Sequence, residues 1–154
     1  MPRYFRVEQA QSLLPEVRAA IERAINARKD YETSERQLQQ ALRRIAMLGG
    51  SIADRDSIAA DRMRRDQSAK ALNEAIGQIH EFGCLVKDLD MGLIDFPTRL
   101  NGREVLLCWK LGEDGIGWWH GTEEGFRGRK PIDDDFLANH EGERPSEGPP
   151  DRIC

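Results

Sequence analysis

The residues with the most capacity for chemistry lie in an apolar, tryptophan-rich segment in the second half of the chain. If residues 101–102, an Asn-Gly pair, form a hairpin turn, Cys108 lies directly opposite Asp95. Lys110 and Trp119 then share the same face of the predicted sheet. A nearby lysine favours the thiolate, so this set would make Cys108 reactive. The alternative is that Cys108 is a small buried apolar side chain and Asp95 an acid that anchors a turn or an ion pair.

His120 ends a Trp-Trp-His run, and a histidine among aromatic residues can move a proton or contact a ligand. It can equally be a satisfied residue that closes the end of the sheet. A third strand that returns through a tight loop of about two or four residues puts His120 and Trp118 on the face of Trp109. That face is opposite to the face of Asp95. We therefore expect no Asp–His pair unless a β-bulge intervenes.

The segment after His120 reads GTEEGFRGRKP. Its glycines and basic residues can hold an anion through backbone amides and guanidinium groups, although it does not match the phosphate-loop pattern. Alternatively, Arg129 pairs with Glu113 or Asp95. The candidate ligand-binding residues are therefore Asp95, Cys108, Glu113, Trp119, His120 and Arg129.

The sequence predicts no catalytic residue set, no cofactor and no metal site. His80 and Cys84 are four residues apart and are followed by Asp88 and Asp90, a spacing that would suit two ligands on one helix face. Gly83 is expected to end the helix before Cys84, and no second ligand pair stands at a useful spacing. A solvated helix end is the more ordinary interpretation.

An arginine-rich stretch surrounds the predicted link between two helices. Arginines spaced along a helix can grip phosphates, which makes nucleic acid a second alternative partner. Aspartates are interleaved with these arginines, however, and an exposed helix laced with both charges is the more ordinary account. The candidate nucleic-acid residues are Arg43, Arg44, Arg62 and Arg65.

Helical periodicity dominates the first half of the chain. Apolar residues recur at steps of four and three over residues 17–45 and, more weakly, over residues 58–79. Gly49-Gly50 is a helix-ending signal, and the short link after it predicts a long antiparallel helical hairpin, resembling a coiled coil, over about residues 8–83. Pro15 is expected to mark a kink or restart, with residues 8–14 as a separate turn.

Folding this hairpin about residues 51–52 places Ile45 opposite Ile58 and puts Leu38 and Leu42 in the seam. The seam has few apolar layers, so we expect it to gain burial from the sheet or from a second copy of the chain. A homodimer formed through the hairpin is therefore predicted.

At Cys84 the apolar period changes from helical to alternating, which predicts a three-stranded antiparallel β-meander over about residues 92–120. A two-residue turn at Asn101-Gly102 pairs Leu100 with Arg103, and further along pairs Ile94 with Trp109. A Gly-rich loop, residues 121–132, follows the meander.

Composition and charge distribution indicate the domain organisation and the compartment. Residues 1–83 hold 14 Lys and Arg against 12 Asp and Glu, and the rest of the chain holds 9 against 15. We expect residues 1–132 to form a single α+β domain and residues 133–154 a disordered acidic tail. Three cysteines without paired spacing, and no signal peptide or membrane span, predict a cytoplasmic protein that has no membrane partner.

The central block GCLVKDLDMGLIDFPTRLNGREVLLCWKLGEDGIGWWHGTEEGFRGRKP resembles a family of small prokaryotic proteins known as domain of unknown function 2203. The opening segment RYFRVEQAQSLLPEVR is similar to the start of that family, so the resemblance extends to about Ile132. It implies a site and no particular activity. The positions that match the recurrent pattern are Lys87, Asp88, Gly92, Asp95, Phe96, Gly102, Arg103, Cys108, Trp109, Glu113, His120, Gly125 and Arg129.

Three functions remain open at this point. The first is a non-catalytic interaction or scaffold protein, homodimeric and with an unidentified protein partner. The second is a small-ligand or enzymatic site on the meander and the loop after it, which requires the candidate side chains to converge on one cleft. The third, which the interleaved acids disfavour, is weak nucleic-acid binding at the arginine-rich hairpin tip.

Overall fold

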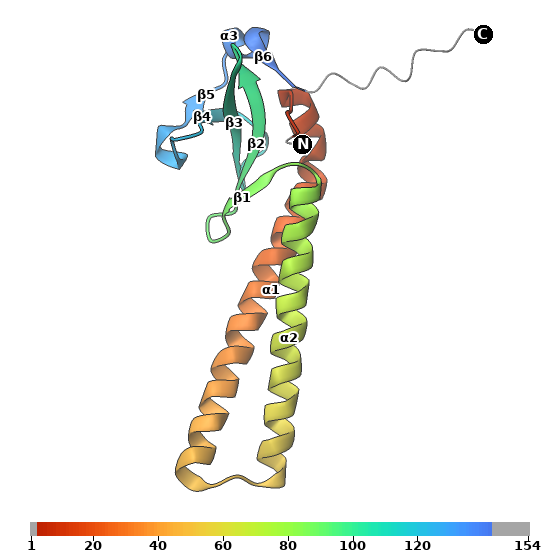
Figure 1. Ribbon diagram of the computed structural model, residues 1–154, viewed down its shortest axis with the longest axis vertical. Coiled ribbons are helices and arrows are strands. Elements are labelled where there is room, and N and C mark those ends of the chain that lie inside the picture. The colour runs from red at the N-terminus through yellow and green to blue at the C-terminus, as the bar shows by residue number, and fades with distance from the viewer. Residues whose placement is uncertain (1–2, 143–154) are drawn as a thin grey trace, which may run out of the picture. The chain divides into compact units, whose positions relative to one another are not determined.

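The computed structural model describes residues 3–142 and has an α+β fold, with two long helices followed by an antiparallel sheet (Figure 1). The chain divides into two compact units. Among the described residues, one unit contains residues 3–18 together with residues 79–142 and holds the sheet; the other is the helical segment 19–78. The elements are α1 (Val7–Leu48), α2 (Ile52–Glu81), β1 (Leu85–Asp88), β2 (Leu93–Leu100), β3 (Arg103–Lys110), β4 (Trp118–Gly121), the 3-10 helix η1 (Phe126–Gly128), β5 (Lys130–Pro131), α3 (Asp134–Asn139) and β6 (His140–Glu141).

The helical unit is a hairpin with a small apolar cluster. Leu38, Ala41 and Ile58 form this cluster and Ile45 packs against it, which agrees with the expected place of Ile45 and Ile58 in the seam. Leu42 was placed wrongly in the seam, because its side chain is 36% exposed. The seam steps from Leu38 by three residues to Ala41, and then by four to Ile45, so Leu42 turns outward.

The restart expected at Pro15, with residues 8–14 as a separate turn, is wrong, because α1 continues through this residue from Val7 to Leu48. Proline removes one helical hydrogen bond and crowds the preceding turn. Leu14 and Val17, on either side of it, are buried. Burial of these side chains offsets the cost of the missing hydrogen bond.

The sheet has more strands than the three-stranded meander that the sequence predicts. Its order is β1-β2-β3-β4-β5, with β6 paired to β2. The added strands, β1, β5 and β6, have two to four residues each, too few for alternation to reveal them. β1 also contains an irregularity at Lys87, since Val86 pairs with Ile94 but Asp88 pairs with Leu93.

The hairpin of β2 and β3 has the predicted register. Leu100 pairs with Arg103, Asp95 with Cys108, and Ile94 with Trp109. The turn between the strands has φ of 51° at Asn101 and 81° at Gly102. Positive φ at both central residues matches the right-handed twist of the flanking strands, and asparagine and glycine adopt it at least cost.

The third strand, β4, has a different register from the expected one. Leu106 pairs with His120 and Leu107 with Trp119, one residue away from the nearer of the two expected registers. A shift of one residue exchanges the two faces of a strand. His120 therefore shares its face with Asp95 and Cys108, and Trp119 points to the other face, the reverse of the expectation.

The shift arises in the connection between β3 and β4, which is longer than the tight loop that the sequence predicts. The Glu113 side chain accepts a hydrogen bond from the Lys110 backbone N–H at 2.7 Å, and the Glu113 N–H donates to the Lys110 carbonyl at 3.0 Å. Further along, the Ile116 N–H donates to the Gln11 side chain at 2.9 Å. These bonds hold a wide loop that sequence alternation does not describe.

The predicted disordered tail is wrong for its first part. Asp133 caps α3 by accepting a hydrogen bond from the Phe136 N–H at 2.8 Å. Phe136 is buried and its ring contacts both Trp119 and His140. The His140 Nε2 in turn accepts a hydrogen bond from the N–H of Val7 at 3.1 Å. The rest of that predicted tail, residues 143–154, lies outside the described residues.

The apolar face of the sheet is covered by the first residues of the chain, within the same unit. Phe5 meets Phe96 edge-on, with ring centroids 5.3 Å apart, and its N–H donates to the Pro97 carbonyl at 2.7 Å. The Arg18 guanidinium, on α1, lies over the Trp109 ring. Phe5, Phe96 and Trp109 are fully buried, so this face of the sheet forms the core of the unit. The opposite face carries Asp95 and Cys108.

Candidate functional site

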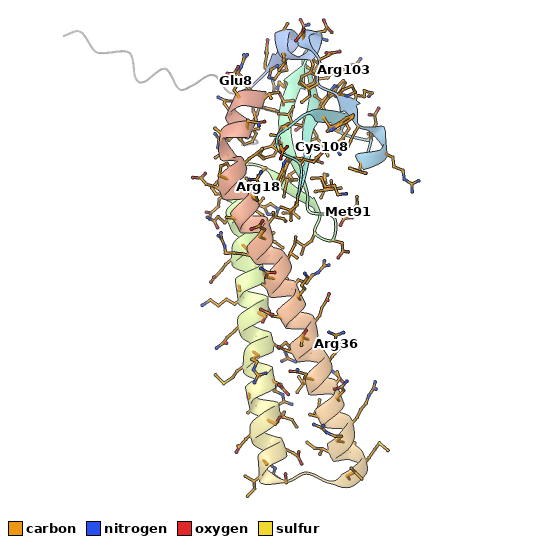
Figure 2. All side chains as sticks on the ribbon, turned by 180° about the vertical axis from the view of Figure 1, so that it is seen from behind. Glu8, Arg18, Arg36, Met91, Arg103 and Cys108 are labelled. Carbon is orange, nitrogen blue, oxygen red and sulfur yellow. The ribbon has the colours of Figure 1, made fainter. Side chains whose placement is uncertain are left out.

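Three chemically capable side chains meet on that second face, each from a different strand. Asp95 on β2 pairs with Cys108 on β3, and the neighbouring pair Leu106–His120 brings His120 alongside them from β4. A carboxylate oxygen, Sγ and an imidazole nitrogen all lie within 4.8 Å of one another. The three residues are only 1%, 1% and 3% exposed. Cys108 can be found on β3 in Figure 2.

The hydrogen bonds of His120 define its proton positions. Its Nδ1 lies 2.8 Å from the Gly121 carbonyl oxygen, which can only accept, so Nδ1 carries a hydrogen. Its Nε2 lies 3.1 Å from Asp95 Oδ1. One proton must lie between Nε2 and Oδ1 for this contact to be a hydrogen bond, so Asp95 and His120 share one proton in addition to the hydrogen on Nδ1.

The second oxygen of the same carboxyl group is unsatisfied. Asp95 Oδ2 is buried and has no hydrogen-bond partner among the described residues. Leaving a buried polar atom unpaired costs about 1–3 kcal/mol, and more for a charged group. Such an atom in a folded protein requires an explanation, and a ligand that donates to it is one.

Cys108 is not an activated nucleophile. Burial raises the pKa of its thiol to about 12, the negative charge of Asp95 adds to the rise, and the Arg129 charge opposes it. The expectation that Lys110 would favour the thiolate is wrong, because its Nζ lies over the Phe126 ring at 5.6 Å and the environment of the thiol is dominated by burial. His120 cannot relay a proton from thiol to carboxylate either, since its Nδ1 is bound to a backbone carbonyl.

A cleft of about 440 Å³ opens beside the three residues. Its walls come from β1, from the turn before β2 that holds Met91 (labelled in Figure 2), and from the loop after β4. This volume lies in the range of small-molecule sites. Besides the Asp95, Cys108 and His120 cluster, its lining comprises Lys87, Asp88, Met91, Leu93, Thr122, Glu123, Glu124, Gly125 and Phe126.

Glu113 and Arg129 form an ion pair that also contacts the backbone of Cys108. The Arg129 Nη2 donates to both Glu113 carboxylate oxygens, at 2.7 and 2.9 Å, and reaches the Cys108 carbonyl at 3.5 Å. Its guanidinium lies 5.0 Å from the Trp118 ring centroid and 4.8 Å from that of Phe126. The charge of Arg129 is thus matched by Glu113, which is one of the two pairings that the sequence allowed.

Most of the chain, including both units, matches a known family. Residues 3–132 match the family described as an uncharacterized conserved protein, DUF2203. The chain belongs to this family. Searches of the curated proteins and of the solved structures found no match. The resemblance seen in the sequence is thereby confirmed, over nearly the same residues.

The candidate residues of this DUF2203 protein divide into three groups. Asp95, Cys108 and His120 converge, while Glu113 and Arg129 pair beside them. Trp119 lies on the other face, where its ring centroid is 5.1 Å from that of Phe136. It is therefore separate from the cleft.

The four arginines considered for nucleic acid lie in the helical unit. Arg65 pairs with Glu35 at 3.4 Å and with Asp66 at 3.3 Å. Arg43, Arg44 and Arg62 are exposed. None of the helices within residues 3–142 has both the length and the apolar character that crossing a bilayer requires.

Sequence reasoning missed several cleft residues as site residues. Lys87 and Asp88 were among the positions that the resemblance to the family pointed to, and this was the available signal for them. Glu123, Glu124 and Phe126 lie in a Gly-rich loop with no periodicity, so nothing in the sequence assigns them to one surface.

Proposed function

We propose that this DUF2203 protein binds a small electropositive ligand, either a cation or a strong hydrogen-bond donor, in the cleft beside Asp95, Cys108 and His120. The observation that carries the proposal is the buried, unpartnered Oδ2 of Asp95. A ligand that reaches this oxygen replaces the hydrogen bond that folding leaves unmade and recovers its cost.

The charges around the cleft favour the same class of ligand. Asp88 and Glu123 add negative charge to the lining, against one positive charge from Lys87. Glu124 is already paired with Lys130 at 2.9 Å. A cleft lined by one dominant sign of charge concentrates ligands of the opposite sign.

The test is a titration followed by NMR, with ammonium, guanidinium, imidazolium, ethanolamine and Zn²⁺ as probes. At least one probe should give saturable shifts at His120 and Cys108 in the wild-type protein. The Asp95→Asn variant should lose these shifts while keeping the dispersed spectrum of a folded protein. Asp114→Asn, which alters an exposed carboxylate in the β3–β4 connection, is the matched control and should bind like the wild type.

Two results would contradict the proposal. In one, none of the probes produces saturable shifts in the wild-type protein. In the other, binding occurs but is unchanged in Asp95→Asn, which would place the ligand elsewhere.

We propose as a second function that the helical unit mediates self-association. Exposed apolar side chains beside the link between α1 and α2 support this proposal. Met47 and Leu48 are each 83% exposed and Ile52 is 79% exposed. Neighbouring exposed apolar residues of this size mark interaction surfaces more often than isolated ones do. A dimer would have twice the 17.5 kDa chain mass by light scattering, and Met47→Lys with Leu48→Lys should reduce it to the chain mass. A wild-type protein that is monomeric at micromolar concentration would contradict this.

A further inference from the structure

We propose that the ligand of the cleft is a divalent transition-metal ion of the zinc class, bound by an Asp95 carboxylate oxygen, Cys108 Sγ and His120 Nε2. This inference deepens the proposed function and rests on it. It is supported by the distances between the three groups, by the orientation of the imidazole and by the composition of the donor set.

The distances suit one ion. Bond lengths of about 2.0–2.3 Å to nitrogen, oxygen and sulfur place the ligands of a tetrahedral zinc roughly 3.3–3.7 Å apart. The three donor atoms here lie within 4.8 Å of one another, and Nε2 and Oδ1 are 3.1 Å apart. The three donors come from neighbouring, paired strands, so the sheet holds their backbones close together.

The imidazole is oriented as a metal ligand would be. Metal-bound histidines usually donate their other ring N–H to a carbonyl or carboxylate, which fixes the tautomer and the ring direction. The His120 Nδ1 makes such a bond to the Gly121 carbonyl at 2.8 Å. The lone pair of Nε2 is thereby directed at the cluster, where a metal ion would replace the proton shared with Asp95.

The donor set selects the kind of metal. Thiolate and imidazole are ligands of zinc, cobalt and related ions, whereas magnesium and calcium prefer oxygen donors alone. With zinc bound, one carboxylate and one thiolate balance the charge of the ion, so the buried site is electrically neutral. Two protons leave to solvent on binding, one from the Asp95–His120 pair and one from the Cys108 thiol.

Three protein ligands leave a fourth coordination position. Zinc sites with three protein ligands hold water or a substrate in that position, whereas structural zinc sites are closed by four. Here the fourth position would face the cleft, between the Lys87–Met91 segment and the loop that carries Glu123. A small anion or water in this cleft would then be held by the ion, with Lys87 nearby.

The test uses Co²⁺ as a spectroscopic substitute for Zn²⁺ on protein freed of metal with a chelator. A Cys84→Ala, Cys154→Ala background leaves Cys108 as the single thiol. We expect one Co²⁺ per chain, a sulfur-to-cobalt charge-transfer band, and displacement of the cobalt by Zn²⁺. Cys108→Ser in this background should abolish the band, and Asp95→Asn and His120→Gln should each weaken Zn²⁺ binding at least about tenfold.

The outcomes separate this inference from the proposed function. Absence of the charge-transfer band, or Zn²⁺ binding that is undiminished in Cys108→Ser, would overturn the metal site. If guanidinium or ethanolamine still produced shifts that depend on Asp95, the proposed ligand site would stand without the metal. If no probe and no metal ion bound, both would fall.

Discussion

The Glu113–Arg129 pair provides the sharpest test of how the site is supported. Replacing Arg129 by methionine keeps most of its aliphatic stem and removes the guanidinium. The side chains of Arg129 and Glu113 are 10% and 26% exposed, so the pair is largely shielded from water. We expect Arg129→Met to destabilise the unit that contains the sheet much more than loss of a surface ion pair would.

The magnitude follows from the contacts. Hydrogen bonds to charged groups contribute about 1.5–3 kcal/mol. The cation–π contacts of Arg129 with Trp118 and Phe126 add roughly 0.5–1 kcal/mol each, because both rings are partly exposed. Partial hydration of Glu113 after the substitution reduces the loss. The expected decrease in the free energy of unfolding is therefore about 3 kcal/mol.

Urea unfolding followed by tryptophan fluorescence measures this change in the relevant unit, because all three tryptophans lie in β3 and β4. Lys130→Met is the matched control, since Lys130 pairs with Glu124 through side chains that are 48% and 44% exposed. Its cost should stay below about 1 kcal/mol.

A loss for Arg129→Met no larger than that for Lys130→Met would refute this reasoning. A double-mutant cycle with Glu113→Gln adds a second criterion. The two substitutions should be coupled by at least about 1 kcal/mol, since residues in direct contact are rarely additive.

Three further outcomes are expected. His140→Ala should cost about 1–2 kcal/mol in urea unfolding, because the N–H of Val7 loses its acceptor. Leu38→Ala should destabilise the helical unit by about 2–5 kcal/mol, measured by circular dichroism. Burial raises the pKa of Cys84 from 9.0 to about 12, so the stability contributed by its protonated thiol should be complete below pH 9 and be lost between pH 9 and 12. Denaturation curves at these pH values should show that Cys84→Ala loses less stability over this interval than the wild type, and an equal loss would exclude the thiol as its source.

The sequence was sufficient where a local signal had only one structural solution. Asn101-Gly102 determined the turn, and through it the register of β2 and β3, because few residues accept positive φ at both central positions of a turn. The helical hairpin was predictable for a similar reason, since glycines follow a long apolar period. Leu42 was misplaced because spacings of three and four residues are both compatible with a helix face.

Only part of the candidate site could be predicted from the sequence. Residue types and the β2–β3 register placed Asp95 opposite Cys108, but His120 was assigned to the wrong face. The side chain of Glu113 bonds to the backbone of Lys110 and holds a wide connection, and such a bond has no periodic signature. The helix of residues 134–139 was missed because its burial depends on one residue, Phe136, in an acidic segment.

The trio of Asp95, Cys108 and His120 has a consequence for chains that fold with misaligned strands. No strand contributes two of its members, so the trio exists only while the β2–β3 and β3–β4 ladders are both in register. Sliding β4 by a single residue would keep most backbone bonds yet turn the imidazole to the far side of the sheet. Chains misaligned in this way would retain strand content but would lack the trio, and a probe of the three side chains therefore reports correct strand alignment as well as binding.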